Sequence, residues 1–198
     1  PNGFDPDYIF HILSKKENIS FFSAPTMIKL LLESNNLGGD ISGLKTICYG
    51  GGPMYLSDIK EAIEVFGQNL YQLYGQGESP MTISNVTKEM HHATYGIDRD
   101  HILSSVGVAR TGVEISIVSP DGEEIPTEGL GEIITRSPCV MSGYLNNESA
   151  TKNTLKNGWL YTGDMGSIDG YGILTLKDRA KDLIISGGMN IYPRGIED

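Results

Sequence analysis

Three short segments, far apart in the chain, carry side chains that together could hold a nucleotide. Tyr74-Gly75-Gln76-Gly77-Glu78 follows a strand-like run, and Tyr161-Thr162-Gly163-Asp164 and Asp178-Arg179 come much later. Glycines let the backbone approach a ligand closely, and an aromatic ring can lie on a base. One carboxylate can hold a metal ion, and another can accept hydrogen bonds from two ribose hydroxyls. The order of these segments predicts one mononucleotide pocket built from separate loops.

The composition is that of an ordinary globular protein and argues against two classes of partner. Of 198 residues, 39% are hydrophobic and 20% are charged, and 15 Lys and Arg face 25 Asp and Glu, a formal charge of −10. Such a surface repels polyanions, so we expect no nucleic-acid partner. No apolar run approaches the roughly 18 residues of a membrane span, so we expect no transmembrane segment. A small anionic ligand would need a metal ion or a few focused cations.

The cysteines and histidines match no metal-ligand spacing. Cys48 and Cys139 each lie among strand-like residues, so we expect both to be buried, reduced and structural, as in a cytoplasmic protein. The pair His91-His92 precedes a polar stretch, and we expect a solvated loop there. The chain begins Pro1-Asn2-Gly3 without an initiator Met, which suggests a piece of a longer protein.

Helix and strand signals alternate from residue 5 to residue 74, which predicts an α/β unit with a parallel βαβ sheet. We expect helices at 5–16, at 25–33 and after a cap at Ser57, and strands at 19–23, 44–49 and 69–74. Two of these strands end in glycine-rich loops, at Gly50 and at Gly75. Ligands of such sheets bind beyond the carboxyl ends of the strands, so we place the site at these two loops.

The residue pattern changes near residue 106, where strict alternation replaces helical periodicity. Val113, Ile115 and Ile117 alternate with polar residues, and Asp169-Gly170 is a hairpin signal before an expected strand at 171–176. The predicted organisation is an α/β part over 1–105 and a small antiparallel β-barrel-like part over 106–178. Residues 179–198 follow as the start of a third, α+β part.

Five segments in this order resemble the acyl-adenylate-forming superfamily of AMP-dependent synthetases and ligases, which includes acyl-CoA synthetases, amino-acid adenylation domains and luciferases. The segments are Gly50 to Pro53, Tyr74 to Glu78, Gly143-Tyr144, Trp159 to Asp164, and Asp178 to Pro193. The resemblance implies that 1–105 is the second half of a large N-terminal domain. It also implies that 179–198 holds the hinge and first strand of a truncated C-terminal domain. Members activate a carboxylate with ATP to an acyl-adenylate and commonly pass the acyl group to a thiol.

The resemblance implies contacts to ATP or AMP for nine residues. They are Gly51, Gly52, Pro53, Tyr74, Gly75, Gln76, Gly77, Asp164 and Arg179. In the family, a ring such as that of Tyr74 packs on adenine, and a carboxylate such as that of Asp164 accepts both ribose hydroxyls. Glu78 matches the glutamate that coordinates Mg²⁺, and one carboxylate suffices because substrate phosphates complete the shell.

Further positions are implied for the later steps and for the acid. Lys181 stands where the family pivots its small domain, and Gly187 and Gly188 match the loop that lines the channel for CoA. The candidates for the acyl pocket are Phe22, Ser23 and Met81, with Phe21, Met54 and Pro80 beside them.

Most of these residues also have a purely structural interpretation. The Gly50 to Pro53 segment could be an ordinary strand-to-helix turn, and Tyr74 a half-buried core residue. Glu78 could lie in the first turn of a helix, where the dipole favours an acid. Thr162-Gly163-Asp164 could be a hairpin corner, and Gly187-Gly188 a simple turn.

Gly77 departs from the family pattern, which usually has threonine there, with a hydroxyl that contacts the α-phosphate. A hydrogen bond to a charged acceptor is worth about 1.5–3 kcal/mol, so its loss predicts slower adenylation rather than a different reaction. The family's phosphate loop and its C-terminal catalytic lysine have no counterpart in the 198 residues. We therefore expect an incomplete fragment that turns over nothing by itself.

The sequence predicts an acyl-CoA synthetase of fatty-acid metabolism that uses a carboxylic acid, ATP, CoA and Mg²⁺. Two alternatives remain open. One is an amino-acid adenylation domain of a peptide synthetase, although those favour Tyr-Gly-Pro-Thr-Glu where this chain has Gln76 and Gly77. The other is a non-catalytic nucleotide-binding or interaction protein, which Gly77 favours.

Overall fold

The computed structural model describes residues 3–92, 96–179, 184–186 and 189–191, which fall into two compact units. The first unit spans Pro1–Leu73 and Val86–Ser104, and the second spans Tyr74–Asn85 and Ser105–Asp198. The chain therefore leaves the first unit at Leu73, forms one hairpin arm of the second unit, and returns at Val86. The division at 105 and 178 expected from the sequence stays a prediction.

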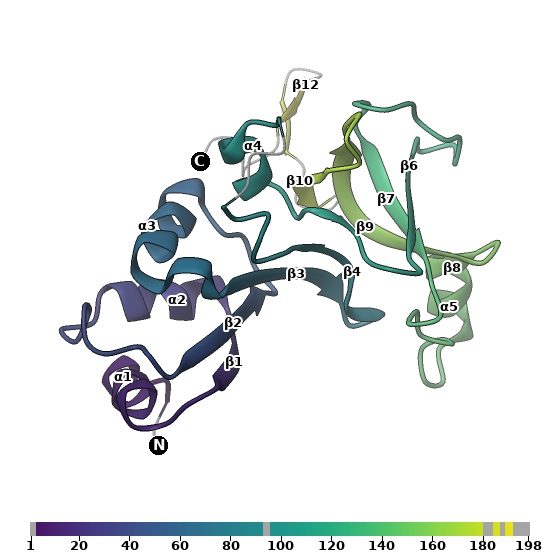
Figure 1. The fold of residues 1–198 in the computed structure, drawn as a ribbon. Helices are drawn as coiled ribbons and strands as arrows, with labels where there is room; N and C mark the ends of the chain where they lie inside the picture. Colours follow the sequence, from purple (N-terminus) through teal and green to yellow (C-terminus); the bar gives the residue numbers. More distant parts are fainter. Residues whose placement is uncertain (1–2, 93–95, 180–183, 187–188, 192–198) are drawn as a thin grey trace. The chain divides into compact units, whose positions relative to one another are not determined.

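The first unit is a parallel βαβ arrangement, as predicted (Figure 1). Its elements are α1 (Pro6–Lys15), β1 (Ile19–Ser23), α2 (Pro25–Leu32), β2 (Leu44–Gly50), α3 (Leu56–Phe66), the 3-10 turn η1 (Gly67–Asn69), the first part of β3 (Leu70–Gln76), and α4 (Arg99–Leu103). β2 pairs in parallel with both β1 and β3, so that Cys48 lies between Phe22 and Tyr71 in register. α2 and α3, the blue helices of Figure 1, contact each other beside these strands.

The core of the first unit follows from the helical periodicity of α3. Ile59, Ala62, Ile63 and Phe66 are buried, at i, i+3, i+4 and i+7, and pack with residues of α1, α2, β2 and α4. The predicted cap was wrong: the N-cap residue is Tyr55, and no side chain caps α3. The helix begins at Leu56, two positions earlier than a Ser57 cap would require, so Ser57 is the second residue of the helix.

The second unit is built on a curved antiparallel sheet, the green strands of Figure 1, and confirms the predicted β-barrel-like part. Its elements are the end of β3, β4 (Ser79–Val86), β5 (Val108–Ala109), β6 (Glu114–Val118), β7 (Gly131–Arg136), α5 (Glu148–Thr154), β8 (Leu155–Lys156), β9 (Trp159–Ile168), β10 (Leu174–Arg179), β11 (Ile184–Ser186) and β12 (Met189–Ile191). The sheet order is β10-β9-β7-β6, with β8 beside β9. β11 and β12 pair with each other.

The buried face of this sheet carries the second core. Ile117 and Ile133 pack there with Ile83, Val106 and Leu174. The strand expected at 171–176 begins only at Leu174, because the Asp169 carboxylate accepts hydrogen bonds from the amides of Tyr171 and Ile173 and holds a turn.

Two expectations about isolated residues were wrong. Cys139 is exposed and Cys48 is only half-buried, although both thiols are free. His91 lies in a loop as predicted, but its side chain is fully buried rather than solvated. A pair of consecutive histidines looks solvated in sequence because nothing local shows that Tyr49, far away in the chain, bonds one of the rings.

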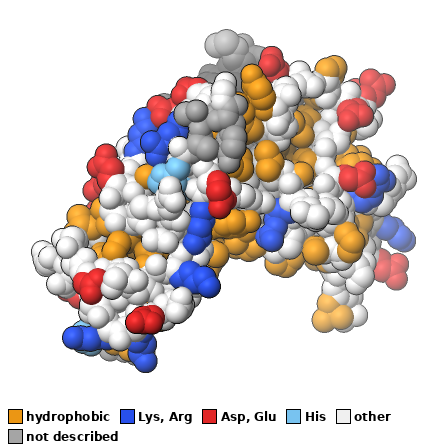
Figure 2. Space-filling view, in the orientation of Figure 1, with side chains coloured by type: hydrophobic (Ala, Val, Ile, Leu, Met, Phe, Trp, Pro, Cys, Tyr) orange, Lys and Arg blue, Asp and Glu red, His pale blue; other side chains and the backbone are white. Residues whose placement is uncertain are grey.

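The described surface mixes charges of both signs. In the view of Figure 2, basic and acidic side chains are interspersed over the visible face, with apolar side chains between them. Among the described residues, no helix is long and apolar enough to cross a membrane.

Candidate active site

The Tyr74 to Glu78 segment forms the tip of the β3–β4 hairpin. β3 ends at Gln76 and β4 starts at Ser79, so Gly77 and Glu78 are the two turn residues. A Cβ on Gly75 would lie 2.4 Å from the Met81 amide nitrogen, so only glycine fits there. A Cβ on Gly77 would meet nothing within 4 Å, so the turn does not require glycine at that position. Glu78 lies in a β-turn, which excludes the helix-start interpretation.

Tyr74 and Asp164 meet inside the second unit. The Tyr74 hydroxyl donates to Asp164 Oδ2 at 2.7 Å, and the two residues are only 7% and 8% exposed. The Gln76 amide reaches the same carboxylate oxygen at 3.4 Å and the Thr162 carbonyl at 3.1 Å. The structure thus brings together three of the residues predicted to contact a nucleotide. Tyr74 also belongs to the apolar core, so its structural and its functional interpretations both apply.

The segment before Asp164 is fixed by β7 rather than by a hairpin corner, because it lies within β9. The Thr162 hydroxyl donates to the Ile133 carbonyl at 2.7 Å and accepts from the Asp164 amide at 3.1 Å. The Gly163 amide donates to Glu132 Oε1 at 2.9 Å. Sequence reasoning missed Glu132, since a carboxylate in a strand gives no local sign of its partner.

The ladder on both sides of β9 is irregular near Asp164. Against β7 the register shifts between Glu132 and Ile134, and against β10 it shifts between Leu176 and Asp178. The Arg179 backbone lies directly opposite Asp164 in the β9–β10 pair, and the ribose contact of Arg179 stays a prediction. Lys181, Gly187 and Gly188 lie outside the described residues.

Glu78 is held by the loop that follows β7. Its Oε1 accepts the Tyr144 hydroxyl at 2.5 Å, and its backbone carbonyl accepts the Met141 amide at 2.8 Å. Donation to this carboxylate raises the pKa of the Tyr144 phenol. No group of three acidic, His or Cys side chains gathers among the described residues. The donor set therefore fits Mg²⁺ only in the form that binds one carboxylate together with phosphate oxygens.

The remaining candidates divide between the two units. In the first unit, Gly51, Gly52 and Pro53 form an exposed bend after β2, and Gly51 has a positive φ of 80°. Phe22 is 49% exposed, whereas Ser23 is fully buried and its hydroxyl donates to the Ala24 carbonyl at 3.2 Å.

Met81, with Pro80 before it, is the acyl-pocket candidate of the second unit. It is half-buried in β4 and has a left-handed φ of 53°. Its carbonyl accepts a hydrogen bond from Arg110 Nη1 at 2.9 Å. Because Phe21, Phe22, Ser23 and Met54 lie in the first unit, an acyl pocket shared by all the candidates stays a prediction.

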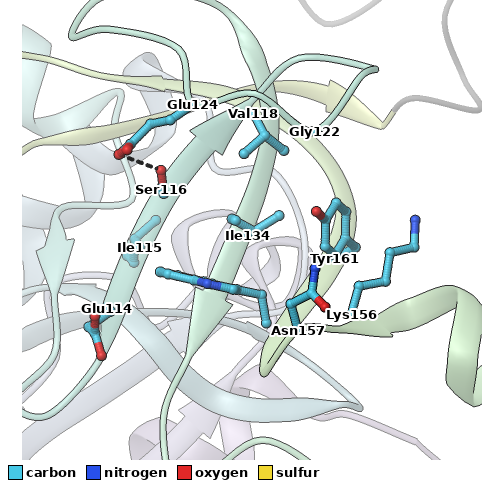
Figure 3. A pocket seen from close by; sticks show the side chains of 11 residues that line it. Glu114, Ile115, Ser116, Val118, Gly122, Glu124, Ile134, Lys156, Asn157 and Tyr161 are labelled. Atoms are coloured by element: carbon cyan, nitrogen blue, oxygen red, sulfur yellow. Dashed lines mark hydrogen bonds between the residues drawn. The ribbon is translucent and has the colours of Figure 1, made fainter.

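A separate hollow of about 580 Å³ lies on the other face of the β6–β7–β9 sheet (Figure 3). Ile134 lies at its centre, and Glu114, Glu124 and Tyr161 lie around it. Its charged groups already have partners: Glu124 accepts from Ser116 at 2.9 Å, and the Lys156 ammonium lies 4.4 Å from the centre of the Tyr161 ring. β9 thus contributes to this hollow and, further along, to the Asp164 cluster.

Comparison with known proteins identifies the family. A scan against protein families matches residues 1–145 to the AMP-binding enzymes. The chain belongs to the AMP-binding enzyme family. Its homologues are AMP-forming acyl-CoA and aryl-CoA ligases, which confirms the resemblance drawn from the motifs.

Three known proteins illustrate the similarity. The medium/long-chain-fatty-acid–CoA ligase FadD8 of Mycobacterium tuberculosis is 32% identical over 98% of this chain and 33% of its own length. The amide bond synthetase McbA of Marinactinospora thermotolerans superimposes with a TM-score of 0.88, at 32% identity, over 99% of this chain and 39% of McbA. The O-succinylbenzoate coenzyme A synthetase of Bacillus subtilis, in complex with AMP, superimposes with a TM-score of 0.82, at 34% identity, over 98% of this chain and 38% of the synthetase. The chain thus spans 33% to 39% of the length of these proteins.

Proposed function

We propose that this chain is part of an enzyme that activates a carboxylic acid with ATP and transfers the acyl group to CoA. The observation that carries the proposal is the buried Tyr74–Asp164 hydrogen bond of 2.7 Å, with Gln76 on the same carboxylate. A buried carboxylate held by two neutral donors, beside a hairpin tip that presents Glu78, has the chemistry of a ribose-and-phosphate site. Membership of the AMP-binding family supports this interpretation.

Each residue has a defined task in the proposed reaction. Asp164 accepts the ribose hydroxyls, Tyr74 supports the base, and Gln76 holds the Asp164 carboxylate in place. Glu78 holds Mg²⁺, which when bound neutralises charge on the phosphates. An oxygen of the substrate carboxylate bonds to the α-phosphorus while the bond to pyrophosphate breaks. The CoA thiol then loses its proton to solvent as its sulfur bonds to the acyl carbon, and the bond from that carbon to the phosphate oxygen of AMP breaks. The protein contributes position and charge stabilisation.

The acid and the acceptor are the finer parts of the proposal. We propose a fatty or aryl acid, because relatives include a fatty-acid–CoA ligase and an O-succinylbenzoate coenzyme A synthetase. An amine acceptor is the second candidate, because a protein described as an amide bond synthetase superimposes with a TM-score of 0.88. Amino-acid adenylation and a non-catalytic nucleotide-binding role remain as further outcomes.

We further propose that the 198 residues alone form no acyl-adenylate and that the whole protein works in the cytoplasm. The first point rests on the short span of the chain relative to its relatives and on the missing phosphate-loop and catalytic lysines. Measuring AMP formation by the isolated chain tests it directly. Appreciable turnover would contradict the proposal of an incomplete site.

Pyrophosphate exchange by the full-length protein that contains this chain tests the reaction class. A panel of fatty, aryl and amino acids should give acid-dependent exchange, followed by AMP release with CoA or with amines. Asp164→Asn should lower exchange by about 10- to 100-fold, since a hydrogen bond to a charged group is worth about 1.5–3 kcal/mol. Asp121→Asn, in an exposed turn, is the matched control. If none of the acids in the panel supports pyrophosphate exchange, the non-catalytic interpretation is favoured.

A further inference from the structure

The Gly143-Tyr144 motif has no task in the proposed reaction, yet its tyrosine touches the metal candidate. The Tyr144 hydroxyl donates to Glu78 Oε1 at 2.5 Å, across 66 residues of sequence. Both residues belong to the second unit. Tyr144 is 37% exposed, so its ring is not needed to fill the core. Because this phenol donates its hydrogen bond to a partly exposed carboxylate, a role in positioning that carboxylate is indicated.

The backbone of Tyr144 is itself fixed by α5. Its amide donates to Thr151 Oγ1 at 2.9 Å, and the Thr151 hydroxyl donates to the Asn147 carbonyl at 2.9 Å. Asn147 caps α5 through its side chain. A Cβ on Gly143 would lie 2.9 Å from Thr151 Cγ2, so glycine permits this close approach. The phenol therefore projects from an anchored loop, not from a freely moving one.

The same loop also holds Glu78 through its backbone. The Met141 amide donates to the Glu78 carbonyl at 2.8 Å, so main chain and side chain of the glutamate are both bound by residues 141–144. Within the described part of the chain, no donor bonds the second carboxylate oxygen, Oε2. A carboxylate held through one oxygen has lost rotational freedom and presents the other oxygen in a defined direction.

We propose that Tyr144 is a positioning residue for Glu78: its phenol fixes Oε1 and leaves Oε2 to bind the metal of Mg·ATP. This inference rests on the proposed function. It differs from a stabilising role, because the bond joins two partly exposed side chains and its loss should change metal-dependent binding more than folding.

The test uses the full-length protein and measures ATP affinity with Mg²⁺ and with EDTA. Wild type should bind ATP more tightly with Mg²⁺ than with EDTA. In Tyr144→Phe the ratio of these two affinities should be about tenfold smaller, with the ATP affinity in EDTA unchanged. Glu78→Gln should abolish the gain, and the double variant should be no worse than Glu78→Gln alone, because Tyr144 acts through Glu78. Tyr171→Phe, at an exposed turn, is the matched control.

A second readout needs no nucleotide. In protein labelled at the ζ-carbon of tyrosine, the resonance that Tyr144→Phe removes reports on the phenol that donates to Glu78. Glu78→Gln should shift that resonance and leave the Tyr171 resonance in place, because the charged acceptor of the Tyr144 hydrogen bond is gone.

The outcomes separate the inference from the proposed function. If wild type gains affinity from Mg²⁺ and Tyr144→Phe behaves like Tyr171→Phe, the positioning role is refuted and the proposed function stands. If Tyr144→Phe costs as much in the Glu78→Gln background as in wild type, Tyr144 acts elsewhere and the role is again refuted. If wild type gains nothing from Mg²⁺ and exchanges no pyrophosphate, the proposed function fails and the inference with it.

Discussion

Acid should weaken the first unit through one imidazole, that of His91. The ring is fully buried, Nδ1 lies 2.6 Å from the Thr87 carbonyl, and Nε2 lies 2.9 Å from the Tyr49 hydroxyl. Since a carbonyl only accepts, Nδ1 carries the proton and Nε2 accepts from Tyr49, so the neutral ring is fully paired. A second proton would have to enter between Nε2 and the phenol. Burial accordingly lowers the pKa of His91 to about 4.

Proton linkage gives the direction and the size of the change in the free energy of unfolding with pH. Between about pH 6.5 and about pH 4 the unfolded chain binds a proton at this imidazole and the folded chain does not, so stability falls as the pH falls. Above this window both states are neutral, and below it both are protonated. At about 1.36 kcal/mol per pH unit, the gap between the two pKa values corresponds to roughly 3 kcal/mol in the free energy of unfolding.

Two measurements check this prediction. The ring resonances of His91 should stay at neutral-imidazole positions until about pH 4. In urea unfolding, wild type should lose more stability between neutral and acid pH than His91→Gln, which has no imidazole to titrate. His11→Gln removes an exposed histidine and should leave the wild-type pH dependence intact. The reasoning would be refuted by a His91 ring that titrates near pH 6.5. It would also be refuted if the free energy of unfolding changed equally with pH in wild type and in His91→Gln.

Three further substitutions probe the site. Gly75→Ala should destabilise the chain by about 1–3 kcal/mol or more in urea unfolding, because its Cβ would lie 2.4 Å from the Met81 amide nitrogen; unchanged stability would contradict this. Gly77→Thr should fold with equal or up to about 1 kcal/mol higher stability, since its Cβ meets nothing, and should speed adenylation by the full-length protein; a slower rate would count against the missing-hydroxyl argument. Tyr74→Phe should cost about 1.5–3 kcal/mol of stability by removing the bond to Asp164, and should weaken AMP binding measured by calorimetry; tight binding would show that this phenol is dispensable.

The parts of the fold that sequence reasoning found are those with a local periodic signal. The apolar spacing of Ile59, Ala62, Ile63 and Phe66 predicted α3, and the alternation around Ile115 and Ile117 predicted β6. In both cases the burial of one face imposes the period, so the pattern is visible without knowing what covers it.

The incorrect predictions concern residues whose burial or position depends on other parts of the chain. The burial of His91 depends on Tyr49, and the start of α3 depends on which residue takes the cap position. The candidate site divides in the same way. Glycine spacing and residue order predicted Tyr74, Gln76 and Asp164 as neighbours. The contacts of Glu132 and Tyr144 could not be predicted, because they join residues across strands and loops with no shared motif.

The pairing of β9 is irregular against both neighbouring strands near Asp164, which makes this segment sensitive to a deletion. Side chains of a strand alternate between its two faces, and β9 is out of regular register with β7 and β10 on either side of Thr162 to Met165. Against β7, three residues of β9 (Thr162 to Asp164) stand opposite one residue of β7, so deleting Gly163 would leave the ladder irregular but would move Asp164 by one position. A move of one position turns a strand side chain to the other face, so loss of this glycine should break the Tyr74–Asp164 hydrogen bond.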